Sequence, residues 1–328
     1  MRNETFDVLK GIGIIAVIVG HSAIPEIVRN FIFTWHMPLF FMISGYFFYR
    51  LPSLIALRKN FRSLVIPYLF TALILFLFTL IDSFLGQKNI VDNNIKNSIL
   101  AIVVAAGSRD LPNGGEFYVG AIWFLTALFW CRMSFNLICK KFYTNFLAVS
   151  IVISVISTLI AQYIYIPLNI LQGLSALLFF SFGYFVKTNE LLKRTINNYY
   201  IPVILILIIL STYMGPIGMV TCYYPSYVIN ILASIGGGYL LYIISSKIYG
   251  TRYGQILSSI GKLSLIILCF HIIDTQFLSK ICYYIGRVAS ISDTSFKILL
   301  FIWHLLIPIV GAKLITHTRL CRVVFNLH

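Results

Sequence analysis

The sequence predicts an all-helical (all-α) protein that crosses a membrane several times. Hydrophobic residues make up 59% of its 328 residues and charged residues only 11%, and the mean hydropathy is +0.90. Soluble domains carry about 25% charged residues, so this composition excludes an ordinary soluble fold. We therefore expect a polytopic membrane protein in which residues 1–328 form a single integral-membrane domain.

About ten apolar segments are long enough to be transmembrane helices joined by short loops. The candidate spans are residues 8–24, 31–49, 65–85, 119–138, 146–164, 168–186, 200–216, 226–246, 261–279 and 297–315.

The formal charge of +15 follows the predicted topology. With a cytoplasmic N-terminus, most of the 25 Lys and Arg residues fall on the cytoplasmic side, as the positive-inside rule requires. This assignment counts Arg132 with the cytoplasmic group and Arg29 with the outer group. We expect both termini in the cytoplasm, and no nucleic-acid partner, since the basic charge reflects topology.

The sequence shows no sign of a cleavable signal peptide, a disulfide framework or a metal site. The first apolar segment contains His21 and Pro25 and lacks a small-residue cleavage site, so it is expected to stay as an anchor. The six cysteines show no paired spacing, so we expect neither a disulfide framework nor a metal site.

Lys10 and His21 place a cation and an imidazole inside the first predicted span. Ionisable side chains are costly in hydrocarbon, so they indicate function there. Their spacing turns a helix about 20° past three full turns, which puts both on one face about 16 Å apart. Asp7 lies three residues before Lys10 and is its expected partner. The alternative for His21 is a structural histidine satisfied by helix packing.

The second predicted span opens with the motif Trp35–Tyr46, and its His36 is expected in the same half of the membrane as His21. Two neighbouring imidazoles can act as a base and a proton relay. The alternative is that Trp35 and His36 anchor the helix end at the interface. Ser44 and Gly45 permit the close approach of another helix.

Two further features concern the outer loop and the ninth span. Residues 86–118 form the longest segment between spans, with a turn signal at residues 112–115 just before Glu116. Such a loop is either a lid or binding element or a plain surface loop.

His271 and Asp274, in the ninth predicted span, are one turn apart and are expected to form a structural polar pair.

The chain resembles the integral-membrane acyltransferase 3 family, most closely its fucose 4-O-acetylase-like sugar O-acetyltransferase branch. The resemblance covers nearly the whole chain. The stretches that carry it are Phe6–Gly11 through His21, Trp35–Tyr46, Ile66–Tyr68, Ile122–Leu125, Phe182–Tyr184, and Ile260–Ser264 leading to His271.

The resemblance implies a bacterial inner-membrane enzyme that transfers an acyl group to a sugar hydroxyl. The expected donor is acetyl-CoA, and the expected acceptor is a cell-surface polysaccharide or its lipid-linked precursor. The family hallmark is a basic residue, ten intervening residues and a histidine, which Lys10 and His21 match. Arginine is usual at the first position, and a lysine cannot make the bidentate contact of an arginine.

The chemistry assigns roles to the catalytic candidates His21, Lys10 and His36. O-acylation needs a base for the hydroxyl proton, expected to be His21 with His36 as its relay. Lys10 either stabilises the acyl carbonyl or holds the pantetheine arm of the donor. A covalent acyl-histidine intermediate is the less favoured variant.

Other residues are expected to bind the two substrates. Arg58, Lys59 and Arg62 resemble the basic loop of the family and would bind the phosphates of the coenzyme, although the positive-inside rule alone also explains them. The expected acceptor-binding residues are Asp7, Glu116 and Trp123.

Two other functions remain open from the sequence. A transporter or flippase for a glycan precursor would use the polar track of the first span as a path. Inverted repeats or paired broken helices would favour that function, and the sequence has neither. A non-catalytic membrane scaffold does not explain why Lys10 and His21 share one face of an apolar helix.

Overall fold

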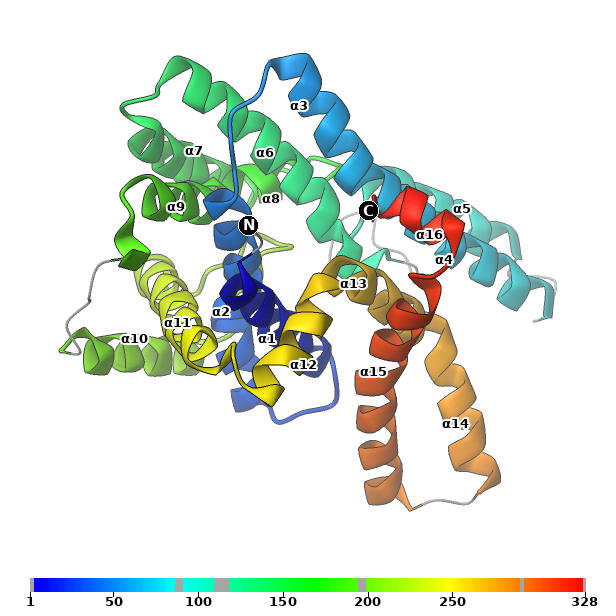
Figure 1. The fold of residues 1–328 in the computed structure, drawn as a ribbon. Coiled ribbons are helices and arrows are strands. Elements are labelled where there is room, and N and C mark those ends of the chain that lie inside the picture. Colours follow the sequence, from blue (N-terminus) through cyan, green and yellow to red (C-terminus); the bar gives the residue numbers. More distant parts are fainter. Residues whose placement is uncertain (1–2, 86–90, 109–117, 194–198, 290–291, 327–328) are drawn as a thin grey trace.

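A computed structural model describes residues 3–85, 91–108, 118–193, 199–289 and 292–326 (Figure 1). Within these ranges the chain is helical, and the one β pairing there is an isolated bridge between Gly218 and Tyr223. The α-helices are α1 (Glu4–Gly20), α2 (Glu26–Tyr46), α3 (Ser53–Asn60), α4 (Ile66–Leu85), α5 (Val91–Val104), α6 (Trp123–Lys141), α7 (Phe146–Ile160), α8 (Ile170–Ser175), α9 (Leu177–Thr188), α10 (Tyr200–Met214), α11 (Tyr227–Ile248), α12 (Arg252–Lys262), α13 (Ser264–Ile273), α14 (Ser279–Val288), α15 (Asp293–Ile315) and α16 (Arg319–Val324). Short π or 3₁₀ segments are η1 (Phe61–Val65), η3 (Gly120–Ile122), η4 (Leu191–Lys193) and η5 (Asp274–Leu278).

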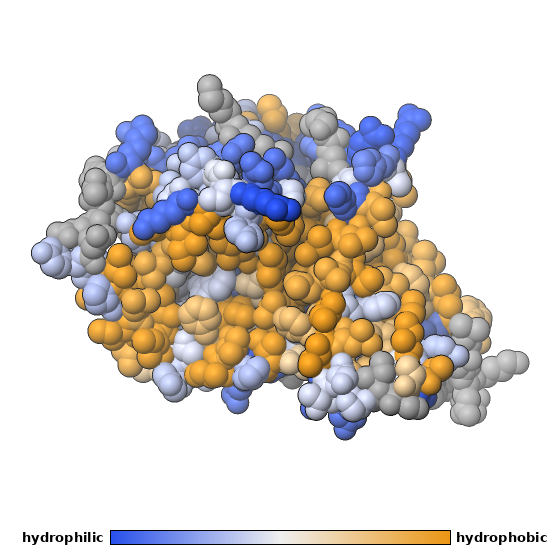
Figure 2. Space-filling view, turned by 60° about the horizontal axis from the view of Figure 1, so that its bottom comes forward, coloured by the Kyte–Doolittle hydropathy of each residue, from blue (hydrophilic) through white to orange (hydrophobic). Residues whose placement is uncertain are grey.

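The surface has the pattern of a multi-pass membrane protein. Figure 2 shows a broad apolar belt between two hydrophilic rims. Six helical segments in the described ranges are long and apolar enough to cross a membrane. They are Ser53–Asp82, Gly120–Lys141, Ile170–Thr188, Tyr227–Ile248, Ser264–Val288 and Asp293–Ile315, and each contains most of one predicted span.

The other four predicted spans also fall on helices, namely α1, α2, α7 and α10. Three of these are short, with 17 residues in α1 and 15 each in α7 and α10. The helical fold is confirmed, whereas the number of ten spans and the side of the termini stay predictions. Helix α2 begins at Glu26, five residues before the predicted span, so Arg29 lies in the helix and not in a loop.

Two predicted spans were too short at one end, because the helix continues through a wider π turn. Helix α3 runs through η1 into α4, and α13 runs through η5 into α14. Pro67 follows η1 directly. A proline removes one helical hydrogen bond and its ring crowds the preceding turn, and a widened turn accommodates both effects. The predicted loop 86–118 is also partly helical, since it contains α5 packed against α4.

Helices α1 and α2 lie at the centre of the fold, and each crosses another helix at close range (Figure 1). A Cβ atom on Gly11 of α1 would overlap the backbone of α12, and one on Gly261 of α12 would overlap the backbone of α1. Gly45 of α2 and Gly183 of α9 make the same reciprocal contact. Small residues at helix crossings allow backbones to approach where a membrane supplies no hydrophobic drive for packing. The approach predicted for Gly45 is confirmed.

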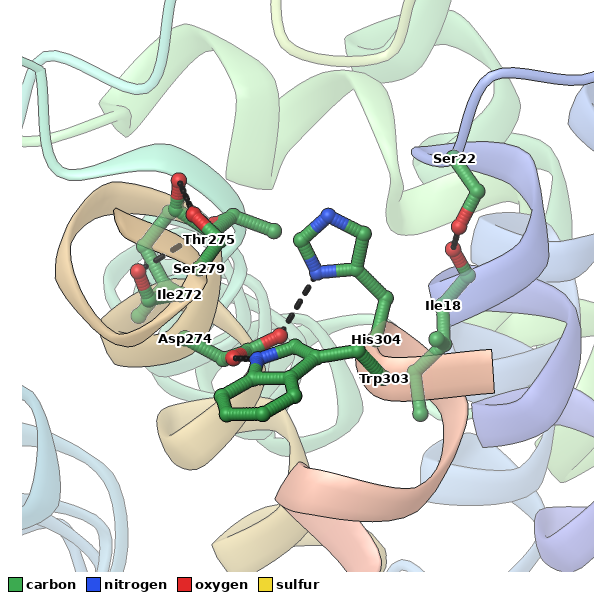
Figure 3. A network of polar contacts seen from close by, with 8 residues as sticks. All are labelled: Ile18, Ser22, Ile272, Asp274, Thr275, Ser279, Trp303 and His304. Atoms are coloured by element: carbon green, nitrogen blue, oxygen red, sulfur yellow. Dashed lines mark hydrogen bonds and ion pairs between the residues drawn. The ribbon is translucent and has the colours of Figure 1, made fainter. Parts of the chain in front are cut away.

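Asp274 connects α15 to the π segment η5. Its Oδ1 accepts a hydrogen bond of 2.8 Å from the indole of Trp303, and its Oδ2 lies 2.6 Å from Nδ1 of His304. Figure 3 shows His304 between η5 on one side and Ile18 and Ser22 of α1 on the other. The carboxylate is fully buried. Its hydrogen bonds to Trp303 and His304 offset the cost of removing this charge from water. The predicted pairing of Asp274 with His271 is wrong, because Asp274 bonds to α15 instead.

The glycine crossings predict a large effect of a single methyl group. Gly183→Ala is expected to lower the thermal unfolding temperature in detergent, because the new Cβ overlaps Met42 O, with a cost of about 1–3 kcal/mol. The matched control is Gly250→Ala, where a Cβ meets nothing within 4 Å. Equal unfolding temperatures for the two variants would show that α2 and α9 do not cross this closely.

Removing the carboxylate of Asp274 is expected to destabilise the protein strongly. Asp274→Ala leaves Trp303 and His304 without their acceptor, and breaking a buried pair in this way costs about 3–5 kcal/mol. Thermal unfolding in detergent measures the loss. The control Asp293→Ala removes an exposed carboxylate at the start of α15, which is worth at most about 1 kcal/mol. A loss of stability for Asp274→Ala no larger than that for Asp293→Ala would show that this carboxylate does not hold α15 against η5.

Candidate active site

Three histidines meet at one cavity, which we call the histidine cavity. His21 caps α1, His36 lies in the middle of α2, and His271 lies in α13. The cavity has a volume of about 470 Å³. Its lining residues are Val17, His21, Phe33, His36, Met37, Gly107, Ser108, Tyr118, Gly120, Ala121, Trp123, Ile217, Gly218, Met219, Val220, His271, Ile272 and Thr275.

The three imidazoles are close enough to work together. The ring centroid of His21 lies 6.4 Å from that of His36 and 5.6 Å from that of His271. His21 is exposed to the cavity, whereas His36 and His271 are buried, each 2% exposed. The proximity predicted for His21 and His36 is therefore present, and His271 is a third member that the sequence analysis placed elsewhere.

Backbone hydrogen bonds fix the proton on two of these rings. Nδ1 of His21 lies 2.8 Å from Val17 O, and Nδ1 of His36 lies 2.9 Å from Ile32 O. A carbonyl oxygen only accepts, so each Nδ1 must carry the proton. In the neutral ring Nε2 is then unprotonated, which is the form that a general base needs.

His271 is placed differently. Its Nδ1 is buried and has no hydrogen-bond partner among the described residues. Its ring faces His21 across the cavity. Because no backbone acceptor fixes its tautomer, this imidazole can present either a donor or an acceptor to a bound molecule.

A second cavity adjoins the first, and we call it the cation cavity. It has a volume of about 360 Å³ and shares Val17 and Met37 with the histidine cavity. Lys10 and Arg132 are its two cations. Its lining residues are Lys10, Ile14, Val17, Met37, Phe40, Ile43, Ser44, Phe47, Leu64, Phe124, Leu125, Leu128, Arg132, Ser264, Leu265 and Leu268.

One stripe of α1 connects the two cavities. Lys10 and Ile14 line the cation cavity, Val17 lines both, and His21 lines the histidine cavity. This is the single helix face predicted from the spacing of Lys10 and His21. Lys10 Nζ donates to Asp7 Oδ1 at 2.8 Å, so the predicted ion pair is confirmed. The Asp7 side chain is 2% exposed and lines neither cavity, and its ion pair with Lys10 joins it to the cation cavity.

Arg132 is a functional candidate that was counted only as one of the cytoplasmic basic residues, although position 132 falls inside the predicted span 119–138. It lies within α6, and its Nε donates to Ser44 Oγ at 2.9 Å, with Nη1 3.4 Å from Asn60 Oδ1. The available signal was an arginine inside an apolar helix, which by default marks a functional position.

The predicted coenzyme-binding cations lie at the surface and line neither cavity. Arg58 and Lys59 are exposed on α3, and Arg62 is exposed on η1. Lys59 donates to the hydroxyl of Tyr49 and lies 4.1 Å from its ring centroid. The same segment reaches the cation cavity through Asn60, the partner of Arg132.

The acceptor-binding candidates fall on the rim of the histidine cavity. Trp123, at the start of α6, lines it, and Gly107 allows the loop to pack directly on Trp123. Gly120 has φ +57°, a conformation that favours glycine, and it brings the segment before Trp123 against Ile272. Glu116 lies outside the described residues, although residues on both sides of it in the loop line the cavity.

The described part of the site offers neither a metal centre nor a thiolate at its loop. No group of three or more His, Cys, Asp or Glu residues in the described ranges is arranged to hold a metal ion. Burial raises the pKa of Cys222, in the loop between α10 and α11, to about 12. That thiol therefore stays protonated at neutral pH and is a poor nucleophile.

A family model covers the part of the chain that forms both cavities. The model of the acyltransferase 3 family, described as an acyltransferase domain, matches residues 3–316, the range that contributes every wall of both cavities. No curated protein and no solved structure matches the chain. Because the match extends over nearly the whole chain, the protein is a member of the acyltransferase 3 family.

Proposed function

We propose that this acyltransferase is a membrane-bound O-acetyltransferase that moves acetyl from acetyl-CoA to a sugar hydroxyl. The observation that carries the proposal is the adjoining pair of cavities, one lined by three histidines and the other by two cations. A thioester donor needs a passage for a long arm with anionic phosphates at its far end. A hydroxyl acceptor needs a base where that passage ends.

His21 is the proposed general base. Its Nε2 takes the proton of the sugar hydroxyl while the oxygen attacks the thioester carbonyl. The C–S bond then breaks, and the thiolate of the coenzyme takes the proton from the imidazolium, so the reaction releases no net proton. His271 is the proposed donor to the oxyanion, because it lines the histidine cavity and its ring centroid lies 5.6 Å from that of His21. His36 is the proposed relay: through a bridging water it would take the proton from His21 and return it before the thiolate is protonated.

Lys10 is proposed to hold the donor arm and not the reacting carbonyl. The rise of α1 separates it from His21 by about 16 Å. Its Nζ is also turned back toward Asp7. Arg132, on α6, is the second cation of the same cavity. Arg58, Lys59 and Arg62 are proposed to meet the coenzyme phosphates at the surface, next to Asn60.

The proposed acceptor is a bacterial cell-surface polysaccharide or its lipid-linked precursor, in the inner membrane. Trp123 supplies an aromatic face on the histidine cavity for a sugar ring. Glu116 is proposed to bind sugar hydroxyls from the loop, and Asp7 to support the site by positioning Lys10.

The direct test is transfer of radiolabelled acetyl from acetyl-CoA into glycan, with membranes that contain the protein. Label that enters the native glycan supports the proposal. Absence of label from acetyl-CoA and from longer acyl-CoA donors alike would refute it and favour transport of a glycan precursor.

His21→Ala is expected to lower the rate of acetyl transfer by about 10²–10⁴-fold, the usual contribution of a general base. The control His317→Ala removes an exposed histidine that lines neither cavity, and it should keep the parental rate. Equal rates for both folded variants would place the base elsewhere.

Arg132→Gln and Lys10→Gln are each expected to raise the KM for acetyl-CoA by about tenfold or more, since a hydrogen bond to a charged group contributes about 1.5–3 kcal/mol. Lys10→Arg should retain most of the affinity. The control is Arg252→Gln, an exposed cation at the start of α12. A fall in kcat with an unchanged KM for acetyl-CoA would contradict the donor role.

A further inference from the structure

The cation cavity and the histidine cavity lie one after the other along the same four helices. In each of α1, α2, α6 and α13, one part of the helix lines the cation cavity and a neighbouring part lines the histidine cavity. On α13, for example, Leu268 lines the cation cavity and His271, one turn later, lines the histidine cavity. A donor arm that enters among the cations therefore reaches the histidines by following these helices.

Val17 and Met37 are the two described residues that line both cavities. Val17 lies on α1 one turn before His21 of the histidine cavity. Met37 lies on α2 one turn before Phe40 of the cation cavity. These two side chains therefore mark the boundary between the cavities, and a molecule that extends from one cavity into the other passes them.

The two side chains differ in how easily they move. Val17 is 1% exposed and β-branched, and a β-branched side chain in a helix has one strongly preferred rotamer. Met37 is half-buried and unbranched, with three rotatable bonds that let it adapt to a neighbouring group. The boundary therefore has one fixed side and one adjustable side.

The backbone beside Met37 is bonded to a neighbouring helix. Pro38, inside α2, has no N–H to donate to the carbonyl of Thr34, four residues earlier. Ser234 Oγ of α11 lies 2.6 Å from that carbonyl oxygen. Because α11 holds the backbone of α2 here, the width of the boundary on this side depends on the Met37 side chain.

The position of His21 defines which part of the donor lies at the boundary. Four residues of helix rise separate Val17 from His21, which is about 6 Å. A thioester whose carbonyl reaches His21 therefore has its acyl group inside the histidine cavity and the arm behind it at Val17. The acyl group passes the boundary first. A linear acyl chain is no wider than the arm that follows it, whereas a chain branched next to the carbonyl is wider.

We propose that Val17 and Met37 form a constriction that selects the acyl donor by the width of its acyl group and not by its length. This inference rests on the proposed function, because it takes an acyl-CoA as the donor. It adds the residues that select the acyl group.

The test compares transfer from butyryl-CoA and isobutyryl-CoA into the native glycan, with membranes that contain the full-length protein. The two acyl groups have the same composition, and only isobutyryl is branched next to the carbonyl. The measured quantity is the ratio of the isobutyryl rate to the butyryl rate, which does not depend on the amount of folded protein. We expect the parent to transfer butyryl and to discriminate against isobutyryl.

Variants at the boundary are expected to change this ratio according to the size of the side chain. Val17→Ala and Met37→Ala should each raise it by about tenfold or more, since a misfit of one carbon in an apolar site changes rates by about 10–200-fold. Val17→Ile should lower it below the parental ratio. Each variant at position 17 retains the backbone carbonyl that accepts the Nδ1 proton of His21.

The matched controls are Val220→Ala and Met219→Ala. They remove the same atoms from residues that line the histidine cavity alone. Both should keep the parental ratio, because they enlarge the space that receives the acyl group and leave the constriction unchanged.

Three results would overturn the proposal while the proposed function stands. They are a ratio that rises as much in the controls as in Val17→Ala, a ratio that Val17→Ala and Met37→Ala leave unchanged, and a parent that transfers acetyl but not butyryl. The first would place the selection inside the histidine cavity, and the last would show selection by length. A parent that transfers no acyl group from any acyl-CoA would instead refute the proposed function, and this inference with it.

Discussion

The cost of an ionisable group in an apolar bundle constrains most of this structure. Three charged side chains within the described helices are held by polar partners from the protein. They are Lys10 with Asp7, Arg132 with Ser44 and Asn60, and Asp274 with Trp303 and His304. Lys10 and Arg132 also line a cavity, so their charge is available to an anionic ligand. Asp274 is enclosed, and its charge serves to hold α15 against η5.

Local spacing predicted the features that one helix determines by itself. The period of an α-helix places Lys10 and His21 on one stripe and Asp7 within reach of Lys10, wherever the helix lies in the protein. Apolar runs in the same way predicted the helices, although not where each begins. The early start of α2, which brings Arg29 into the helix, follows Pro25, a residue that favours the beginning of a helix over its middle.

Contacts between helices could not be predicted from the sequence alone. His271 and Asp274 are one turn apart, which made them natural partners, yet the π turn η5 and the neighbouring α15 turn Asp274 toward His304. Arg132 was counted as one of many basic residues on the cytoplasmic side, and only its hydrogen bond to Ser44 of α2 and its place in the cation cavity single it out. Both errors came from residues whose role depends on which helix lies opposite them.

The orientation of His21 and His36 solves a problem particular to a membrane site. In a soluble Ser-His-Asp triad a buried carboxylate fixes the tautomer of the histidine. A second buried charge beside each imidazole would be costly in this apolar bundle. Here the carbonyls of Val17 and Ile32, one helical turn earlier, receive the Nδ1 protons instead. A neutral acceptor fixes the tautomer without stabilising the imidazolium strongly, so the proton taken by Nε2 is readily given up. That property suits the role proposed for His21, a base that returns its proton to the departing thiolate within the same reaction.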